Sequence, residues 1–130
     1  MANIGDNFIT TLKDAHLRWG THRYTNSRTR IYGEGYLQVP RKEAKRIDLY
    51  NSNKVNANNI YKVSTSDGFF KDLDFKAQGS MRKGDIYAKQ FSAHGDLKLL
   101  GDWYSHIGAT KGDKIKIEWT SPTEILLTKI

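Results

Sequence analysis

The chain has 130 residues, of which 38% are hydrophobic and none is cysteine. That hydrophobic share excludes a disordered tail. No stretch approaches the ~18 uncharged apolar residues of a membrane span. The lack of cysteine excludes disulfides, cysteine-bound zinc and a thiol nucleophile. The first ten residues have neither the basic nor the apolar region of a secretory signal. We therefore expect one cytoplasmic domain without a membrane partner.

Positive charge is the first sign of a partner. Twenty-one Lys and Arg against 14 Asp and Glu leave a net charge of +7, and the stretch from Arg18 to Arg46 alone holds eight basic and two acidic residues. Such an excess favours binding to polyanions. A solvated basic face with no partner is the alternative interpretation.

Residues 1–15 are predicted to contain little regular structure. Phe8, Ile9 and Leu12 have helical spacing, so residues 1–15 are expected to form a short helix or a loose arm ahead of a single domain at 16–130. The next segments are predicted as a strand, an exposed polar arm or hairpin, a short strand stopped by Pro40, and a helix that begins beyond this proline. Their ranges are His16–Thr25, Asn26–Gly35, Tyr36–Val39 and Arg41–Leu49.

The remainder of the chain is predicted to be mostly β. Asn-rich residues 51–59 indicate a loop, and Asp67-Gly68 indicates a hairpin between two strands. A second basic loop spans Gln78–Gly84, and apolar residues recur along one face of Asp96–Ile107, which indicates a helix ended by Gly108. The predicted strands are Ile60–Ser66, Phe69–Ala77, Ile86–Phe91, Lys114–Trp119 and Glu124–Ile130. Seven strands and two helices predict a mainly β (α+β), barrel-like fold.

No catalytic or metal site is evident in the sequence. His16 and His22 are two ligands at most, and zinc sites use three or four. Glu43-Ala44-Lys45 resembles half of a metal-dependent nuclease signature, but no Asp precedes it at the required distance. We therefore predict no catalytic residue, no metal, no cofactor and no enzymatic activity for this chain alone.

The two basic loops have the composition of a binding surface. Asn26–Gly35 and Gln78–Gly84 combine Arg with Asn, Gln, Ser and Thr. Arg can pair with guanine and Asn or Gln with adenine through two hydrogen bonds, while flanking Lys, Arg and Tyr suit phosphates. Ordinary polar hairpins are the alternative.

The order of elements resembles the plant-type "B-three" DNA-binding pseudobarrel, in the version found in restriction endonucleases of the EcoRII, BfiI and NgoAVII kind. The resemblance lies in three places and covers nearly all of residues 16–130. Tyr36–Ala44 matches the strand that runs through Val39-Pro40 into the first helix. Phe91 to Ile115 matches the strand, the second helix and the Gly112-Asp113 opening of a late strand, and Ile125–Ile130 matches the closing strand.

The resemblance implies an open seven-stranded pseudobarrel whose two arms, here Asn26–Tyr32 and Gln78–Lys89, enter the major groove of double-stranded DNA. The chain would then be the target-recognition part of a restriction endonuclease, with a nuclease domain or subunit as a further partner. Residues expected to read bases are Asn26, Arg28, Arg30, Gln78, Ser80 and Arg82. Residues expected to bind phosphates are Arg23, Tyr32, Lys42, Lys83 and Lys89.

Three other functions fit the same composition. A swapped-hairpin antitoxin or transcription regulator also uses Gly-Asp-hydrophobic strands, and sedimentation would reveal its obligate dimer. A single-stranded DNA- or RNA-binding barrel would stack bases on tyrosines such as Tyr24, Tyr32 and Tyr36. A protein-interaction module would not bind nucleic acid.

The variant Arg28→Ala tests the assignment of a base reader. Loss of a bidentate contact should cost about 1–3 kcal/mol in binding and relax preference at one base pair. Binding to a panel of single-base variants of the selected site measures both effects. Equal weakening for every sequence would contradict a base-reading role.

Overall fold

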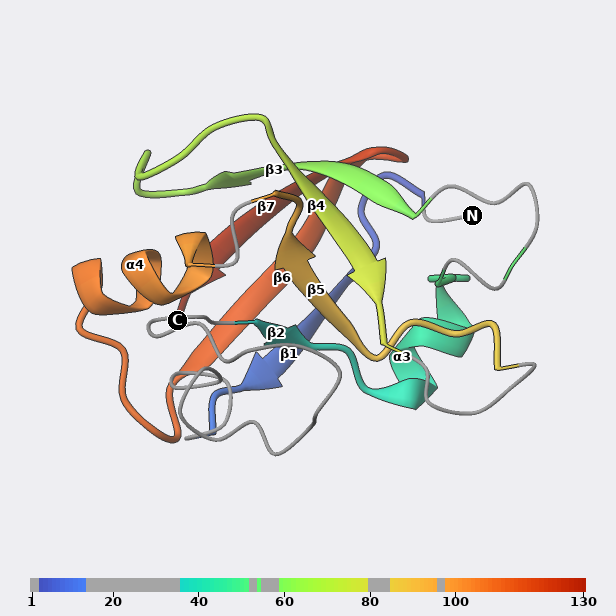
Figure 1. Ribbon diagram of the computed structural model, residues 1–130, viewed down its shortest axis with the longest axis horizontal. Helices are drawn as coiled ribbons and strands as arrows, with labels where there is room; N and C mark the ends of the chain where they lie inside the picture. Colours follow the sequence, from blue (N-terminus) through green and yellow to red (C-terminus); the bar gives the residue numbers. More distant parts are fainter. Residues whose placement is uncertain (1–2, 14–35, 52–53, 55–58, 80–84, 96–97) are drawn as a thin grey trace.

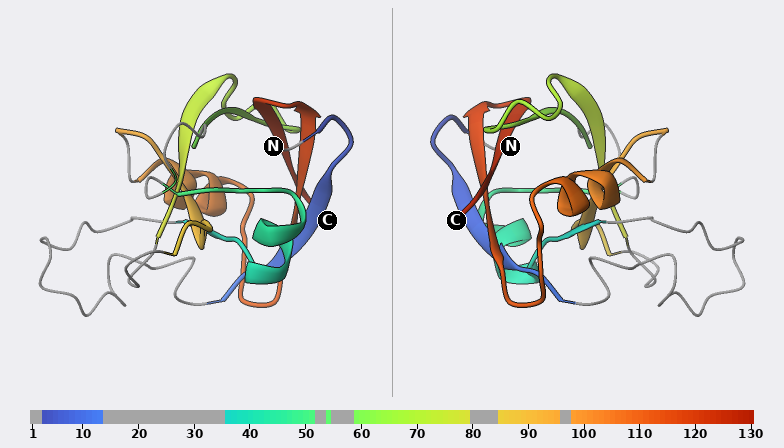
Figure 2. Two further views of the ribbon diagram at one scale, coloured as in Figure 1. Left: turned by 90° about the vertical axis from the view of Figure 1, so that its right-hand side faces the viewer. Right: turned by 90° about the vertical axis from the view of Figure 1, so that its left-hand side faces the viewer.

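The strands of this chain form one sheet that curls into a nearly closed barrel shape (Figures 1 and 2). The computed structural model describes residues 3–13, 36–51, 54, 59–79, 85–95 and 98–130. Within them the strand order is β1-β6-β7-β3-β4-β5-β2, and neighbours pair antiparallel except β3 with β7. The strands are Asn7–Thr11 (β1), Leu37–Gln38 (β2), Ile60–Thr65 (β3), Leu73–Gln78 (β4), Gln90–Ala93 (β5), Lys114–Ser121 (β6) and Glu124–Lys129 (β7).

Alternation of apolar and polar residues sets the inner face of the sheet. On β6, Ile115, Ile117 and Trp119 are buried, while Lys116 and Glu118 between them are half-buried on the outer face. Ile125 and Leu127 of β7 continue the same inner face. This period of two is what a strand with one buried face requires, and it confirms the expectation for both segments.

Two helices lie at opposite ends of the molecule in Figure 1. The helix α3 (Arg41–Arg46) buries Ala44, and α4 (Leu99–His106) buries Leu100, Trp103 and Tyr104. The mainly β architecture with two helices therefore agrees with the expected fold class. No helix in the described part of the chain is long and apolar enough to cross a membrane.

The hairpin between β3 and β4 turns at Asp67-Gly68 as expected. Gly68 has a φ of +77°, a conformation that glycine adopts without strain. The carboxylate of Asp67 accepts hydrogen bonds from the Phe69 backbone N–H (2.9 Å) and from the Trp103 indole N–H (3.0 Å). The turn thus contacts α4, and β4 begins only at Leu73, four residues later than predicted.

Three further expectations about the helices and strands are wrong, one about the type of element and two about its bounds. Residues 7–11 form β1 and pair with β6, in place of a short helix or loose arm, because Phe8, Thr10 and Leu12 alternate inward. The helix α3 ends at Arg46 because Asp48 has a left-handed φ of +55°. The strand predicted at Ile86–Phe91 lies further along, at Gln90–Ala93.

The strand predicted at His16–Thr25 and the arm predicted at Asn26–Gly35 lie outside the described residues. The loop Gln78–Gly84 is described only at its first two residues, and Asp96 and Leu97 ahead of α4 are likewise outside.

Substitution of Phe75 tests how much the barrel core contributes to stability. Its side chain is fully buried on β4 and stacks on Phe70 at 5.4 Å between ring centroids. Phe75→Ala should lower the free energy of unfolding by about 3–5 kcal/mol. Leu73→Ala on the same strand is the matched control: its side chain is 40% exposed, so the loss should stay near ~0.5 kcal/mol. Urea unfolding measures both, and equal losses would contradict the burial of Phe75 in the core.

Candidate nucleic-acid interface

Three of the residues predicted from the sequence as site residues lie in the described part of the chain. They are Gln78, Lys42 and Lys89. The other predicted base readers and phosphate ligands lie outside it: Arg23, Asn26, Arg28, Arg30, Tyr32, Ser80, Arg82 and Lys83.

The fold brings Lys42 and Lys89 to the same end of the barrel. Lys42 is exposed on α3, and Lys89 is exposed just before β5. The backbone carbonyl of Lys89 accepts a hydrogen bond from the Val39 N–H (2.8 Å), which fixes Lys89 beside the start of α3. Two phosphate ligands predicted from distant parts of the sequence therefore share one region.

Gln78 lies at the end of β4, half-buried, and is engaged in the sheet. Its side-chain amide donates a hydrogen bond to the Ser92 hydroxyl on β5. A bidentate contact with adenine would require this amide to leave Ser92. The next residue, Gly79, has a φ of +96°, and a Cβ there would lie 3.3 Å from side-chain atoms of Lys89 and Gln90. This close approach ties the start of the second predicted arm to its end.

An ion pair joins α3 to the segment 85–89. The Arg41 guanidinium donates to the Asp85 carboxylate at 2.8 Å, and the Asp85 side chain is only 5% exposed. The Tyr87 backbone N–H donates to the other carboxylate oxygen at 3.1 Å. These two hydrogen bonds, first that of Tyr87 and then that of Arg41, hold the pKa of Asp85 below its usual 3.8 despite its burial.

Asn51 fixes the same segment from the other side. Its side-chain amide donates to the backbone carbonyls of Asp85 (2.9 Å) and Tyr87 (3.2 Å). Its own N–H donates to the Ile86 carbonyl, and the Ala88 N–H donates to the Leu49 carbonyl, both at 2.9 Å. Residues 49–51 and 86–88 thus form a short antiparallel ladder.

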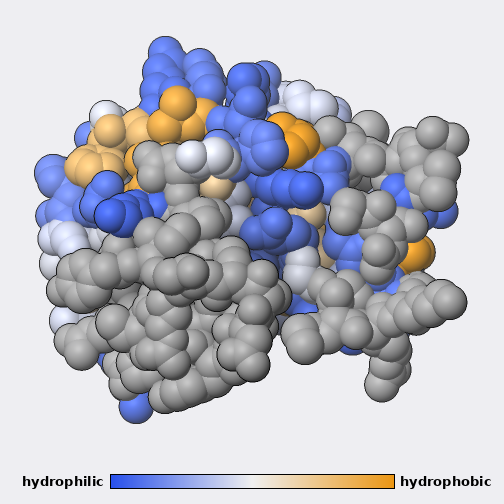
Figure 3. Space-filling view, viewed as in Figure 1, coloured by the Kyte–Doolittle hydropathy of each residue, from blue (hydrophilic) through white to orange (hydrophobic). Residues whose placement is uncertain are grey.

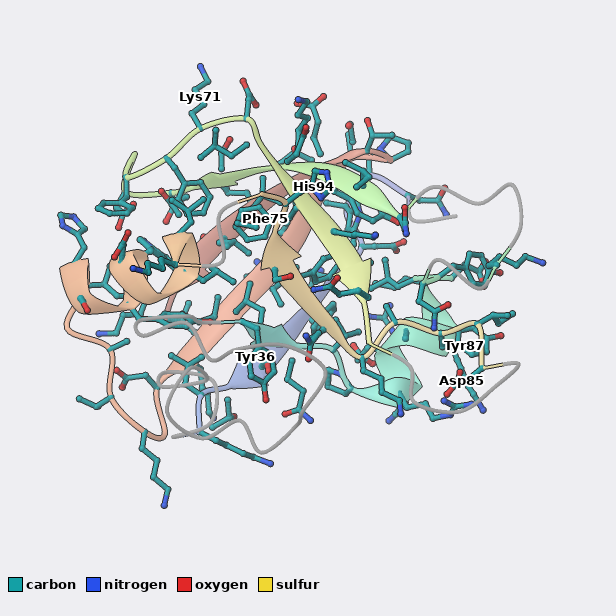
Figure 4. The ribbon with its side chains drawn as sticks, in the orientation of Figure 1. Tyr36, Lys71, Phe75, Asp85, Tyr87 and His94 are labelled. Atoms are coloured by element: carbon teal, nitrogen blue, oxygen red, sulfur yellow. The ribbon has the colours of Figure 1, made fainter. Side chains whose placement is uncertain are left out.

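This ladder places Tyr50 against Tyr87, with ring centroids 5.7 Å apart and the ring planes tilted by 32°. Arg41 and Lys45 lie over the Tyr87 ring, at 5.7 and 5.9 Å from its centroid, and Lys54 lies 5.5 Å from the centroid of Tyr50. Figure 4 shows Asp85 and Tyr87 together beside α3, with Lys71 at the opposite end.

Sequence reasoning missed these tyrosines and cations as site residues. Arg41 and Lys45 stand four apart in a helix, a spacing that places them on one face and could have identified them. No sequence signal pairs Tyr50 with Tyr87, because the contact depends on a ladder between residues 37 positions apart.

Four lysines gather at this end without an ion pair in the described part of the chain. Lys42, Lys45, Lys54 and Lys89 form no ion pair within the described residues. Arg46 of α3 pairs with Glu43 at 2.9 Å, and away from this end Lys62 pairs with Asp74 at 2.7 Å and Lys129 with Asp113 at 3.8 Å. The end formed by α3, residues 50, 51 and 54 and the segment 85–89 therefore carries an excess of positive charge, and we call it the basic end.

The face of Figure 3 also separates polar from apolar surface. Its described part is mainly hydrophilic over β4 and β5, and the hydrophobic colour gathers near the β3–β4 turn and α4. Phe69 and Leu73, 37% and 40% exposed, belong to that turn and the start of β4. The largest apolar area of this face thus lies away from the basic end.

Comparison with known proteins identifies no relative: no protein family, no curated protein and no solved structure matches this chain.

The lowered pKa of Asp85 makes the stability of the fold depend on pH. Because the folded-state pKa is lowered, the unfolded chain binds the proton first, so this carboxylate stabilises the fold above about pH 4 and loses its contribution as the pH falls further. Asp85→Asn should therefore be less stable than the wild type at pH 6, with a gap that narrows towards pH 3. Urea unfolding of both proteins across this range measures the gap, and parallel curves would contradict the assignment.

Proposed function

We propose that this chain binds double-stranded DNA in a sequence-specific manner, as a "B-three"-like pseudobarrel of the restriction-endonuclease kind. Support comes from the barrel-shaped seven-stranded sheet with two helices, the net charge of +7 and the basic end. In this proposal the chain recognises a site in DNA, and a nuclease domain or subunit performs the cleavage.

One observation carries the proposal: the basic end gathers exposed cations that lack carboxylate partners in the described part of the chain. Lys42 on α3 and Lys89 beside it are the clearest pair. A cation without an internal partner keeps its charge available for a phosphate, and release of condensed counterions from DNA then drives binding. Phosphate contacts of this kind fix the orientation of a protein on the duplex.

Base reading is assigned to the two arms on the strength of their sequences. The proposed readers are Asn26, Arg28 and Arg30 in one arm and Ser80 and Arg82 in the other. Gln78 is the exception among the predicted readers, because its amide already bonds Ser92. We therefore assign Gln78 to holding the start of the second arm.

The tyrosines of the basic end favour a duplex over a single strand. A protein that binds single strands needs open aromatic faces on which bases stack. Tyr87 has Arg41 and Lys45 against its ring, and Tyr50 packs on Tyr87 and under Lys54. Rings covered in this way support cations.

Sedimentation separates this proposal from a swapped-hairpin regulator, whose sheet is completed by strands of a second copy. A protein that sediments as an obligate dimer would favour that alternative.

Selection from a random duplex library at ~150 mM salt tests the proposed function. Enrichment of a motif of a few base pairs is expected. Retention without a motif would reduce the function to electrostatic binding, and no retention would favour a protein-interaction module.

Lys42→Ala tests the phosphate contact. The slope of log affinity against log salt should become shallower by about 0.9, the value for one phosphate on B-form DNA, with sequence preference unchanged. Lys71→Ala is the matched control, because it removes the same charge from an exposed position at the opposite end. Fluorescence anisotropy at several salt concentrations measures both slopes. Equal slopes in the two variants would remove Lys42 from the interface.

A further inference from the structure

Tyr50 and Tyr87 form a small aromatic platform outside both predicted base-reading loops. Tyr87 belongs to the segment 85–89, and Tyr50 follows α3. Their centroid separation of 5.7 Å lies in the range of favourable aromatic pairs. Burial, together with the charge and hydrogen bond of Asp48, raises the pKa of the Tyr50 hydroxyl.

The position of the platform is fixed by contacts around it. The left-handed φ of Asp48 ends α3 and turns the chain towards Tyr50. Asn51, which is 3% exposed, then holds the Tyr87 carbonyl through its side-chain amide. These hydrogen bonds fix the backbone segments that carry the two rings.

Three cations lie against this platform, and only one of them is balanced by a carboxylate. Arg41 is balanced by the buried Asp85 carboxylate. Lys45 and Lys54 form no ion pair within the described residues, and their ammonium groups lie 5.9 and 5.5 Å from the Tyr87 and Tyr50 centroids. A cation within about 6 Å of a ring centroid is attracted to the ring face. The platform therefore restrains two flexible lysines whose charges have no internal carboxylate partner.

We propose that Lys45 and Lys54, held on the Tyr50–Tyr87 platform, form a binding site for backbone phosphate groups of the nucleic acid, in addition to the base-reading and phosphate-binding residues predicted from the sequence. Arg41 is a positioning residue that fixes the segment 85–89 through Asp85. This assignment rests on the proposed function and adds ligands that the sequence did not predict. Restraint of the lysines before binding lowers the conformational entropy lost when phosphates are bound.

The charge part of the proposal is tested with the double variant Lys45→Ala/Lys54→Ala. Each lysine should account for about 0.9 of the salt slope, so the double variant should bind duplex with a slope shallower by about 1.8. Lys71→Ala/Lys111→Ala is the matched control, because both of these lysines are exposed and form no ion pair among the described residues. Equal slopes in the two double variants would overturn the site.

The platform part is tested at Tyr87, with charge unchanged. Tyr87→Leu removes the ring and should weaken duplex binding about two- to fivefold, as expected for loss of a surface cation–π contact, while the salt slope stays the same. Tyr87→Phe keeps the ring and should bind as the wild type does. Equal affinity of the Leu and Phe variants would overturn the role of the ring. Since the surface lysine variants do not depend on the ring, they test the site even where Tyr87→Leu is unstable.

The design separates this site from the proposed function. If wild-type protein retains no duplex, the proposed function fails. If it retains duplex and the Lys45/Lys54 variant matches its control, only this site fails. Sedimentation with phosphatidylserine and phosphatidylcholine vesicles tests the other source of phosphate. Dependence on Lys45 and Lys54 for anionic vesicles, but not for duplex, would overturn the assignment to nucleic acid.

Discussion

The short ladder between residues 49–51 and 86–88 is the constraint on which the basic end depends. Its hydrogen bonds join the chain just beyond α3 to the chain just before β5. This ladder brings Tyr50 against Tyr87. Asn51 is the residue that completes it, because one buried amide serves two carbonyls of the opposite segment.

Asp85 explains how a basic surface tolerates a buried carboxylate. Burying an unpaired charge is costly, but here the charge meets Arg41 on one oxygen and the Tyr87 N–H on the other. Replacement of Arg41 would leave the buried Asp85 carboxylate without its cation. The same ion pair holds the segment 85–89 against α3, so the stability of this end and its arrangement of cations are coupled.

The sequence predicts the regular parts of the fold well and the site only in part. On β6 the alternation of Ile115, Ile117 and Trp119 fits a half-buried strand alone, and the prediction is confirmed. Near the N-terminus, Phe8 and Leu12 fit both a helical and a strand period, and pairing with β6 decides in favour of β1. Local pattern thus suffices where one period is consistent with the residues, and tertiary pairing decides the rest.

The number of basic residues in the sequence does not by itself locate the site. The stretch from Arg18 to Arg46 has a large basic excess. Its last residue, Arg46, is engaged in contacts within the fold. Arg46 pairs with Glu43 and donates to the Asn7 carbonyl at 2.7 Å, which fastens β1 to α3. Lys54, outside that stretch, keeps its charge without a carboxylate partner in the described part of the chain and lies on an aromatic ring. A basic residue in the sequence becomes a candidate phosphate ligand only where the fold leaves its charge uncompensated, and at the basic end two such lysines lie on Tyr87 and Tyr50.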